Sequence, residues 1–137
     1  MSLAQSRALA PLALSAALLA ACAGGGGMYD QPYALFAPDS RSVPADTRPA
    51  FVLKVDGDDR TINRSDPEKP GMRVVLVSIP GTRGMGDSSQ DTITIDAKPC
   101  MRYYLAARRS APTTSDWKAF VVGTEPIGEC QRKFGAK

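Results

Sequence analysis

The chain has 137 residues, the size of about one domain, and carries 23% charged residues with a formal net charge of +3. This charge is too small to indicate a polyanionic partner, so we expect no contact with nucleic acid. The sequence contains no histidine, which removes both the commonest metal ligand and the commonest general base. We therefore expect no metal, no cofactor and no enzymatic activity.

Residues 1–21 have the features of an export signal. Arg7 is the only charge before an apolar run from Ala8 to Ala21, and these ~14 residues are fewer than the roughly 20 that a membrane-spanning helix needs. The segment Leu19-Ala20-Ala21-Cys22 resembles the lipobox of bacterial lipoproteins. The resemblance implies cleavage before Cys22, a diacylglycerol on its sulfur, and an acyl chain such as palmitate on the new N-terminus.

The alternative is an ordinary cleaved signal peptide in which Cys22 has no special role. Lipidation has a sound physical basis, because each buried methylene contributes only about 0.8 kcal/mol and lasting attachment needs several chains. Residue 23 is Ala, whereas an Asp there commonly retains Gram-negative lipoproteins at the inner membrane. The resemblance therefore implies an outer-membrane protein that faces the periplasm.

Residues 22–49 are predicted to form a flexible tether. Four glycines, Gly24–Gly27, are costly to order, and four prolines between Met28 and Ala50 favour extended chain. Some 27 flexible residues would reach roughly 30 Å root mean square. The run Tyr33-Ala34-Leu35-Phe36 has two interpretations. It is an edge strand or a cover for the core, or it is a docking segment in which Tyr33 and Phe36 contact a partner protein.

Residues 50–137 are predicted to form a domain built from strands. Alternating or β-branched runs separated by turn-forming residues indicate five or six strands and show no helical periodicity. The expected product is a small antiparallel β-sandwich of Ig-like or transthyretin-like type. The strands are expected at residues 50–56, 59–63, 72–79, 91–96, 100–109 and 117–123, with a polar, glycine-rich loop at 82–90.

Cys100 and Cys130 are predicted to form a disulfide, because an exported chain meets an oxidising compartment. If the last two strands form a hairpin centred near Ser115, each cysteine lies 15 positions from the turn and the two are opposite one another. Closing this loop should contribute about 3 to 4 kcal/mol by the chain-entropy estimate. Free thiols or intermolecular pairing are the alternatives.

The segments Lys54–Gly57 (KVDG) and Pro70–Val77 (PGMRVVLV) resemble the PEGA-type module of bacterial surface proteins. The resemblance covers about half of the mature chain and differs at Thr82, where the family often has an aromatic residue. It implies turn positions at Gly57, Pro70 and Gly71 and core positions at Val75 and Val77.

The strand at 100–109 presents a second candidate binding surface. Arg102, Tyr104 and Arg108 share a face, while the more apolar set (Met101, Tyr103, Leu105, Ala107 and Arg109) is expected to face the core. We call Arg102, Tyr104 and Arg108 the arginine–tyrosine strip. Such a strip suits anionic glycans, lipid headgroups or an acidic protein surface. The alternative is cross-strand pairing with Lys118 and Phe120.

The acids Asp56, Asp58 and Asp59 lie at a turn and are interpreted as solvated surface groups, with no EF-hand pattern around them. No nucleophile motif occurs in the chain. The sequence therefore predicts a non-enzymatic interaction or structural module, held at the membrane through lipid on Cys22 and bound to an envelope protein. The alternatives are an accessory subunit of an envelope machine such as a secretion system, or a module that binds cell-wall glycan or lipid.

Overall fold

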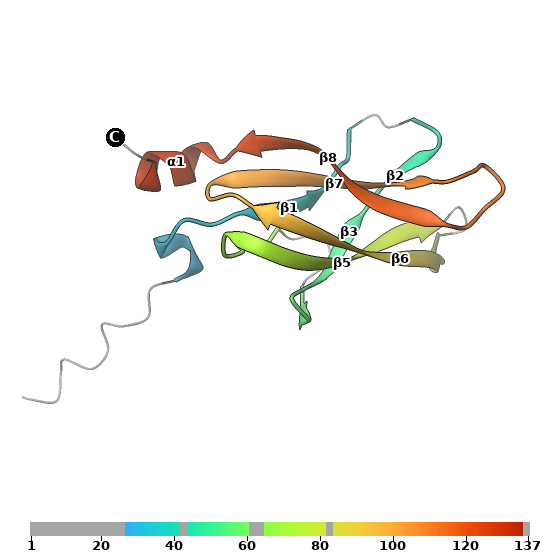
Figure 1. Cartoon of the computed structure of the whole chain (residues 1–137), viewed down its shortest axis with the longest axis horizontal. Helices are drawn as coiled ribbons and strands as arrows, with labels where there is room; N and C mark the ends of the chain where they lie inside the picture. Colours follow the sequence, from blue (N-terminus) through green and yellow to red (C-terminus); the bar gives the residue numbers. More distant parts are fainter. Residues whose placement is uncertain (1–26, 42–43, 61–64, 82–83, 136–137) are drawn as a thin grey trace, which may run out of the picture.

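The computed structural model describes residues 27–41, 44–60, 65–81 and 84–135, so the predicted signal peptide and Cys22 lie outside the described residues. Two four-stranded sheets pack against each other (Figure 1) and confirm the expected small all-β sandwich. The first sheet contains β1 (Leu35–Pro38), β2 (Thr47–Pro49), β7 (Met101–Arg109) and β8 (Trp117–Pro126). The second contains β3 (Phe51–Val55), β4 (Asp58–Asp59), β5 (Gly71–Gly81) and β6 (Gly84–Ala97). A 3-10 helix η1 (Met28–Asp30) precedes β1, and α1 (Gly128–Phe134) follows β8.

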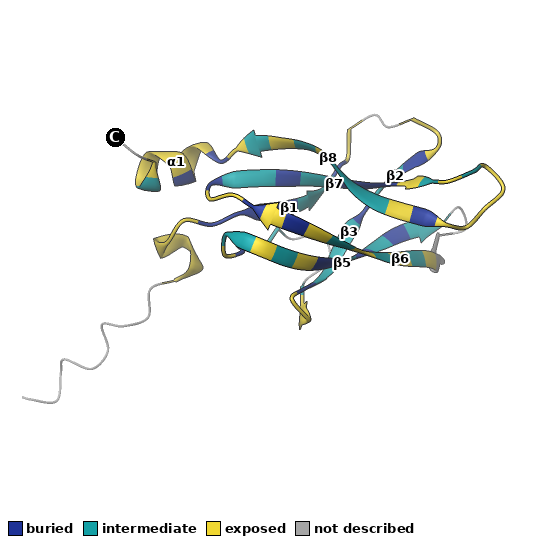
Figure 2. Ribbon diagram, viewed as in Figure 1, coloured by how far each residue is buried: buried dark blue, intermediate teal, exposed yellow. Residues whose placement is uncertain are grey.

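The hydrophobic core lies between the two sheets and follows the period-two pattern of the strands. Val75, Val77 and Ile79 on β5 are fully buried, whereas Met72 and Val74 on the same strand are exposed. The same alternation of buried or half-buried with exposed positions is visible along β6 and β8 in Figure 2. The first sheet contributes Phe36, Tyr103, Leu105, Ala107 and Trp117 to this core.

The sequence predicts that the folded domain begins at residue 50, but the domain of the structure begins earlier. β1 pairs in parallel with β7, and β2 pairs with the same strand in antiparallel register further along it. Pro38 and Pro49 are the last residues of these two short strands. Since proline cannot donate a ladder hydrogen bond, it is tolerated at such edge positions. A proline-rich composition is therefore compatible with edge strands, and the expectation of a long tether was wrong for this segment.

Two sharp turns occur where the sequence indicates them. Asp56 and Gly57 have φ angles of 51° and 90° and connect the paired residues Val55 and Asp58. Positive φ at both central residues is the geometry of a type I′ hairpin turn, which favours Asp-Gly. Gly71 has a φ of 108° and begins β5. A side chain at Gly57 or Gly71 would be strained at these φ values.

Several elements differ from those expected, among them β4, which comprises Asp58–Asp59 where a strand was expected at residues 59–63; residues 61–63 lie outside the described residues. Gly84–Gln90 was expected to be a loop but belongs to β6, because β5 and β6 stay paired as far as Gly81 and Gly84. β8 extends to Pro126. The helix α1 was not expected at all, since seven residues are too short to show a helical period. Among the described residues, no helix is long and apolar enough to cross a bilayer.

A second, smaller hydrophobic cluster lies at the end of the sandwich that carries η1 and α1. It contains the buried residues Tyr33, Leu35, Cys100, Ile127 and Cys130, with Phe134 packed against them. Leu35 and Phe36 are neighbours on β1 and enter different clusters, as strand alternation requires. The segment from η1 to β1 (residues 28–38), which we call the N-terminal segment, is thus held between the main core and α1. We call this the helix end of the sandwich and the end with the β7–β8 loop the loop end (Figure 1).

Candidate functional site

The arginine–tyrosine strip lies on β7, on the face that points away from the main core. Tyr103 and Leu105 are buried in the core, so the alternate positions Arg102, Tyr104 and Arg108 point outward. The structure thus brings the three residues to one surface as expected. The side chains that pair with these residues within the protein determine what this surface can bind.

Arg102 and Tyr104 both bind one carboxylate on the neighbouring strand β8. Nη1 of Arg102 and the hydroxyl of Tyr104 donate to Oε1 of Glu125 over 2.7 and 2.6 Å. The Tyr104 hydroxyl, followed by Arg102, lowers the pKa of the Glu125 carboxyl below its ordinary value. Glu125 lies opposite Arg102 in the β7–β8 register. The sequence did not indicate this pair, because a hairpin centred on Ser115 would place Gly128 opposite Arg102.

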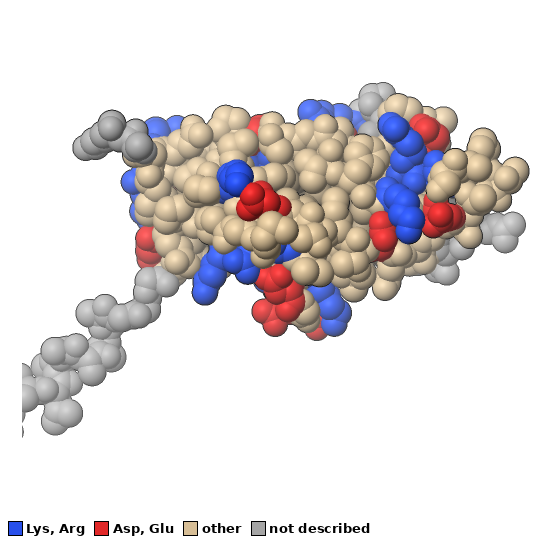
Figure 3. Space-filling model, in the orientation of Figure 1, with Lys and Arg blue, Asp and Glu red and all other residues tan. Residues whose placement is uncertain are grey.

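The remaining cations near the strip are paired in the same way. Arg41 lies over the ring of Tyr104 at 4.8 Å and forms a 2.7 Å ion pair with Asp39. Arg108 lies 3.5 Å from Asp46, and its guanidinium is 5.3 Å from the centroid of the ring of Phe120. Three arginines are therefore matched by three carboxylates: Arg41, Arg102 and Arg108 against Asp39, Glu125 and Asp46. These pairs leave no excess of positive charge on the strip. On the face of the molecule drawn in Figure 3, cationic side chains likewise lie beside acidic ones.

Tyr33 and Phe36, the candidates for partner docking, are buried within the sandwich. They are 5% and 4% exposed, and burial raises the pKa of the Tyr33 hydroxyl. The carbonyl of Tyr33 accepts a 2.7 Å hydrogen bond from the backbone of Cys100, and the ring of Phe36 lies 5.7 Å from that of Tyr103. The segment is an edge strand and part of the core, and its two aromatic side chains offer a partner little surface.

Cys100 and Cys130 form a disulfide with a Cα–Cα distance of 5.2 Å. The pairing is as predicted, but the geometry is different. Met101 pairs with Pro126 at the end of the hairpin, and Cys130 lies beyond it on α1. The disulfide therefore fastens the helix to the β6–β7 turn and covers Tyr33.

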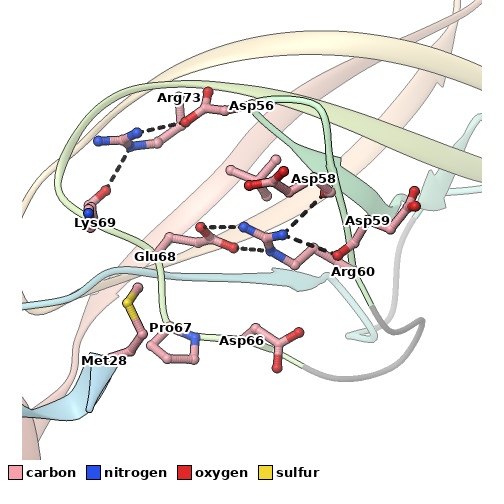
Figure 4. Close-up of a pocket in the computed structure, with 11 residues that line it drawn as sticks. Met28, Asp56, Asp58, Asp59, Arg60, Asp66, Pro67, Glu68, Lys69 and Arg73 are labelled. Atoms are coloured by element: carbon pink, nitrogen blue, oxygen red, sulfur yellow. Dashed lines mark hydrogen bonds and ion pairs between the residues drawn. The ribbon is translucent and has the colours of Figure 1, made fainter. Parts of the chain in front are cut away.

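The acidic turn predicted to be solvated lines an open pocket of about 600 Å³ (Figure 4). Oδ1 of Asp56 accepts a 2.9 Å hydrogen bond from the backbone of Val74, and Oδ2 accepts one of 2.6 Å from Arg73. These bonds lower the pKa of Asp56, with the Val74 amide as the largest cause. Glu68 binds Arg60 through both carboxylate oxygens at 2.5 and 3.0 Å.

The carboxylates of Asp56 and Glu68 already have hydrogen-bond and ion-pair partners within the protein. Asp59 also pairs with Lys54, at 3.0 Å. In the part of the chain that the structure describes, no group of three or more candidate ligands is placed to hold a metal ion. The ion pairs and hydrogen bonds around this pocket therefore connect the β3–β4 turn to β5 and to the segment before β5. Its charged groups stabilise the fold.

No family model, curated protein or solved structure matches this chain. The lipobox and the PEGA-type resemblance remain predictions from the sequence. The functional argument consequently depends on the residues themselves.

Proposed function

We propose that the chain is an envelope lipoprotein, anchored to the outer membrane by lipid on Cys22, whose β-sandwich acts as a non-enzymatic interaction or structural module in the periplasm. The observation that carries this proposal is the order of the segments. A lipobox-like run ending at Cys22 and four glycines precede a sandwich closed by a disulfide. A structural disulfide supports an oxidising compartment. The other two of the three cysteines are bonded to each other, so Cys22 is the cysteine left for lipidation.

The contacts of η1 support a short tether. Nζ of Lys133 on α1 donates to the carbonyl of Tyr29 at 2.9 Å and to Asp30 at 3.1 Å, which fastens η1 to the folded body. Only the residues Ala23–Gly27 then separate Cys22 from attached chain. Five residues cannot span more than about 18 Å even when fully extended. We therefore expect the helix end to lie next to the bilayer and the loop end to point away from it.

The balance of charge on the arginine–tyrosine strip favours contact with a protein over a general attraction to anionic glycan or headgroups. Long-range attraction to a polyanion requires an excess of positive charge. On the strip, each arginine has a carboxylate within 3.5 Å. A protein partner with mixed charges can form complementary pairs with such a surface.

Substitution of Cys22 tests the anchor. In cells that express the full-length chain, we expect labelled palmitate on the wild type and its recovery with the outer membrane. Cys22→Ser should lose the label, the processing and the membrane fractionation. The double variant Cys100→Ser/Cys130→Ser is the matched control, because it removes the other two cysteines, which are bonded to each other, and should keep the label. Unchanged processing and fractionation of Cys22→Ser would overturn the proposal.

Substitution of Ala23, the residue after the lipidated cysteine, tests which membrane holds the lipoprotein. Ala23→Asp should shift the lipoprotein to the inner membrane while leaving palmitate labelling unchanged. Recovery of the wild type with the inner membrane would contradict the outer-membrane assignment and leave the lipid anchor intact.

Photocrosslinking in intact cells tests the orientation and the interaction role. A photoreactive residue at Thr113, in the β7–β8 loop, should give protein adducts identifiable by mass spectrometry. The same residue at Met28, in η1, should give lipid adducts. The reverse pattern would contradict the orientation, and the lack of protein adducts at both positions would contradict the interaction role.

A further inference from the structure

Two arginines at the loop end lie against the single tryptophan of the chain. Trp117 begins β8 and is 9% exposed. The guanidinium carbons of Arg48 on β2 and Arg109 on β7 lie 5.4 and 5.1 Å from the centroid of its ring. Both distances are within the range of a cation–π interaction. Both guanidinium groups therefore lie beside the same indole at this end of the sandwich.

Most other arginines of the described chain are paired with a carboxylate, and these two are not. Five arginines of the described chain form ion pairs with carboxylates: Arg41, Arg60, Arg73, Arg102 and Arg108. In the same described residues, Arg48 and Arg109 have no such pair. The nearby acid Asp116 lies 3.7 Å from Lys118 and accepts a hydrogen bond from Ser110, and Asp46 lies against Arg108. Within the described part of the loop end, these two cations therefore have no carboxylate of their own.

Arg48 and Arg109 line an open pocket of about 220 Å³ together with Trp117. Among the described residues, the other lining side chains carry hydroxyls, and none of the lining side chains is acidic. The volume is smaller than the 300–1,000 Å³ typical of sites for drug-sized ligands, which limits an occupant to a small group. The hydroxyls belong to Ser89, Thr113, Thr114 and Ser115.

The donors around the pocket are held in place by the backbone. Nη1 of Arg48 donates to the carbonyl of Pro80 at 3.0 Å, and Nη1 of Arg109 donates to that of Pro112 at 3.1 Å. The hydroxyl of Thr114 donates to the carbonyl of Ala111 at 3.1 Å, which closes the loop. A guanidinium has five N–H donors, so each arginine keeps donors for a ligand. Among the described residues, Nε of Arg109 is the one buried side-chain polar atom with no hydrogen-bond partner.

We propose that this pocket binds a small oxyanion, a phosphate or carboxylate group, between Arg48 and Arg109 beside Trp117. Guanidinium groups recognise such oxyanions through paired, charge-assisted hydrogen bonds. The anion would offset the repulsion between the two cations and supply acceptors to both guanidinium groups. The site belongs to the folded domain and does not depend on the lipid anchor. In the orientation proposed above, it would face away from the membrane.

Tryptophan fluorescence of the full-length chain in neutral detergent provides a direct test, because Trp117 is the only tryptophan. Separate titrations with inorganic phosphate and with acetate distinguish the two kinds of oxyanion. Sodium chloride at matched ionic strength is the control for screening. We expect a saturable change in Trp117 emission with phosphate or acetate and none with chloride. Equal responses to all three salts, or no saturable response to either oxyanion, would overturn the proposal.

Variants assign the response to the pocket. Arg48→Gln and Arg109→Gln should each weaken binding about tenfold or more, the loss expected for a charge-assisted hydrogen bond. Arg108→Gln is the matched control, because Arg108 precedes Arg109 on β7 but pairs with Asp46, and it should bind as the wild type does. Cys22→Ser should also leave the response unchanged, which separates this site from the anchor.

Circular dichroism shows whether each variant is folded. If a glutamine variant is unfolded, Arg48→Lys and Arg109→Lys replace it, since they keep the charge and lose the paired donors. Wild-type affinity in all the folded variants of Arg48 and Arg109 would contradict the assignment to this pocket.

Discussion

The two ends of the sandwich use their charged groups differently. At the helix end, Lys133 is paired with Asp30 and Arg102 with Glu125, and a disulfide closes over the N-terminal segment. At the loop end, Arg48 and Arg109 lie over Trp117 with no carboxylate paired to either among the described residues. One end directs its polar groups to contacts within the chain. The other keeps hydrogen-bond donors at an open surface.

This contrast separates the contacts that hold the fold from the groups that are available for binding. At the helix end, the Lys133–Asp30 ion pair connects α1 to η1 across 103 residues of sequence, and the Arg102–Glu125 pair connects the neighbouring strands β7 and β8. Such groups gain little from an external ligand, because they already have partners. The loop-end arginines are positioned by single hydrogen bonds to carbonyls, and an added anion would improve their electrostatic surroundings. The comparison predicts stability effects where side chains are buried or paired within the chain, and ligand effects at the loop end.

The largest expected effect is at Phe36, where β1 enters the core. Phe36→Ala should lower the free energy of unfolding by about 3–5 kcal/mol, because it removes a buried aromatic ring and leaves a cavity. Urea denaturation measures the change. Tyr29→Ala is the control: Tyr29 lies four residues from Tyr33 in the same segment but is 54% exposed. If Phe36→Ala unfolded at the wild-type urea concentration, the segment would not belong to the core, and docking through Phe36 would again be the better interpretation.

Reduction of the disulfide should have the next largest effect. The bonded cysteines are 30 residues apart, and loss of the bond should cost about 3–4 kcal/mol by the chain-entropy estimate. The comparison is urea denaturation with and without a reductant, and mass spectrometry should show a gain of two hydrogens on reduction. Cys22→Ser should respond to the reductant as the wild type does. Equal stability of the oxidised and reduced chains would show that α1 does not hold the N-terminal segment.

A smaller effect is expected from the ion pair beneath the β3–β4 turn. The side chains of Arg60 and Glu68 are 19% and 7% exposed. Glu68→Gln would leave a largely buried guanidinium without its counterion, and we expect a loss of about 1–3 kcal/mol. Asp59→Asn is the matched control, because it breaks an ion pair on the surface of the same pocket, where the Asp59 side chain is 86% exposed. Equal losses in urea denaturation would contradict the structural use of the buried pair.

The strands of the main core could be predicted because each buries one face. Alternation around Val75 and Val77 identifies β5, and the Asp56-Gly57 dipeptide identifies the turn before it. β1 and β2 could not be predicted with the same certainty, because they are four and three residues long and end in prolines. Only pairing with β7 makes strands of them, and that information lies more than 50 residues away in the sequence.

The candidate sites depended on details of register that a single sequence does not contain. A β-bulge between Tyr104 and Leu105 and a hairpin turn slightly nearer the N-terminus place Glu125 opposite Arg102. A shift of this size decides whether a strip is a free cationic surface or a neutral network. Arg109 was assigned to the core-facing set, and its buried Nε fits that assignment. Its proximity to Arg48 depends on β2, a strand that the sequence did not reveal.

The smallest expected effect is a dependence of stability on acid that arises at the helix end. Lys133 is the main cause of a lowered pKa at Asp30, whose ordinary value is 3.8, and the Tyr104 hydroxyl is the main cause at Glu125, whose ordinary value is 4.5. A carboxyl with a lowered pKa in the fold binds fewer protons there than in the unfolded chain. Its contribution to stability is therefore complete above the ordinary value and is lost as the pH falls through the lower value in the fold.

Thermal unfolding between pH 7 and pH 2 would measure this dependence. The double variant Asp30→Asn/Glu125→Gln should lose less stability than the wild type as the pH falls below about 4.5, the ordinary value for Glu125. Arg48→Gln should keep the wild-type slope, because Arg48 has no paired carboxylate among the described residues to titrate. A flatter acid slope in Arg48→Gln would reveal a carboxylate partner for this arginine and remove the contrast between the two ends. An unchanged slope in the double variant would mean that the helix-end pairs contribute nothing to folding.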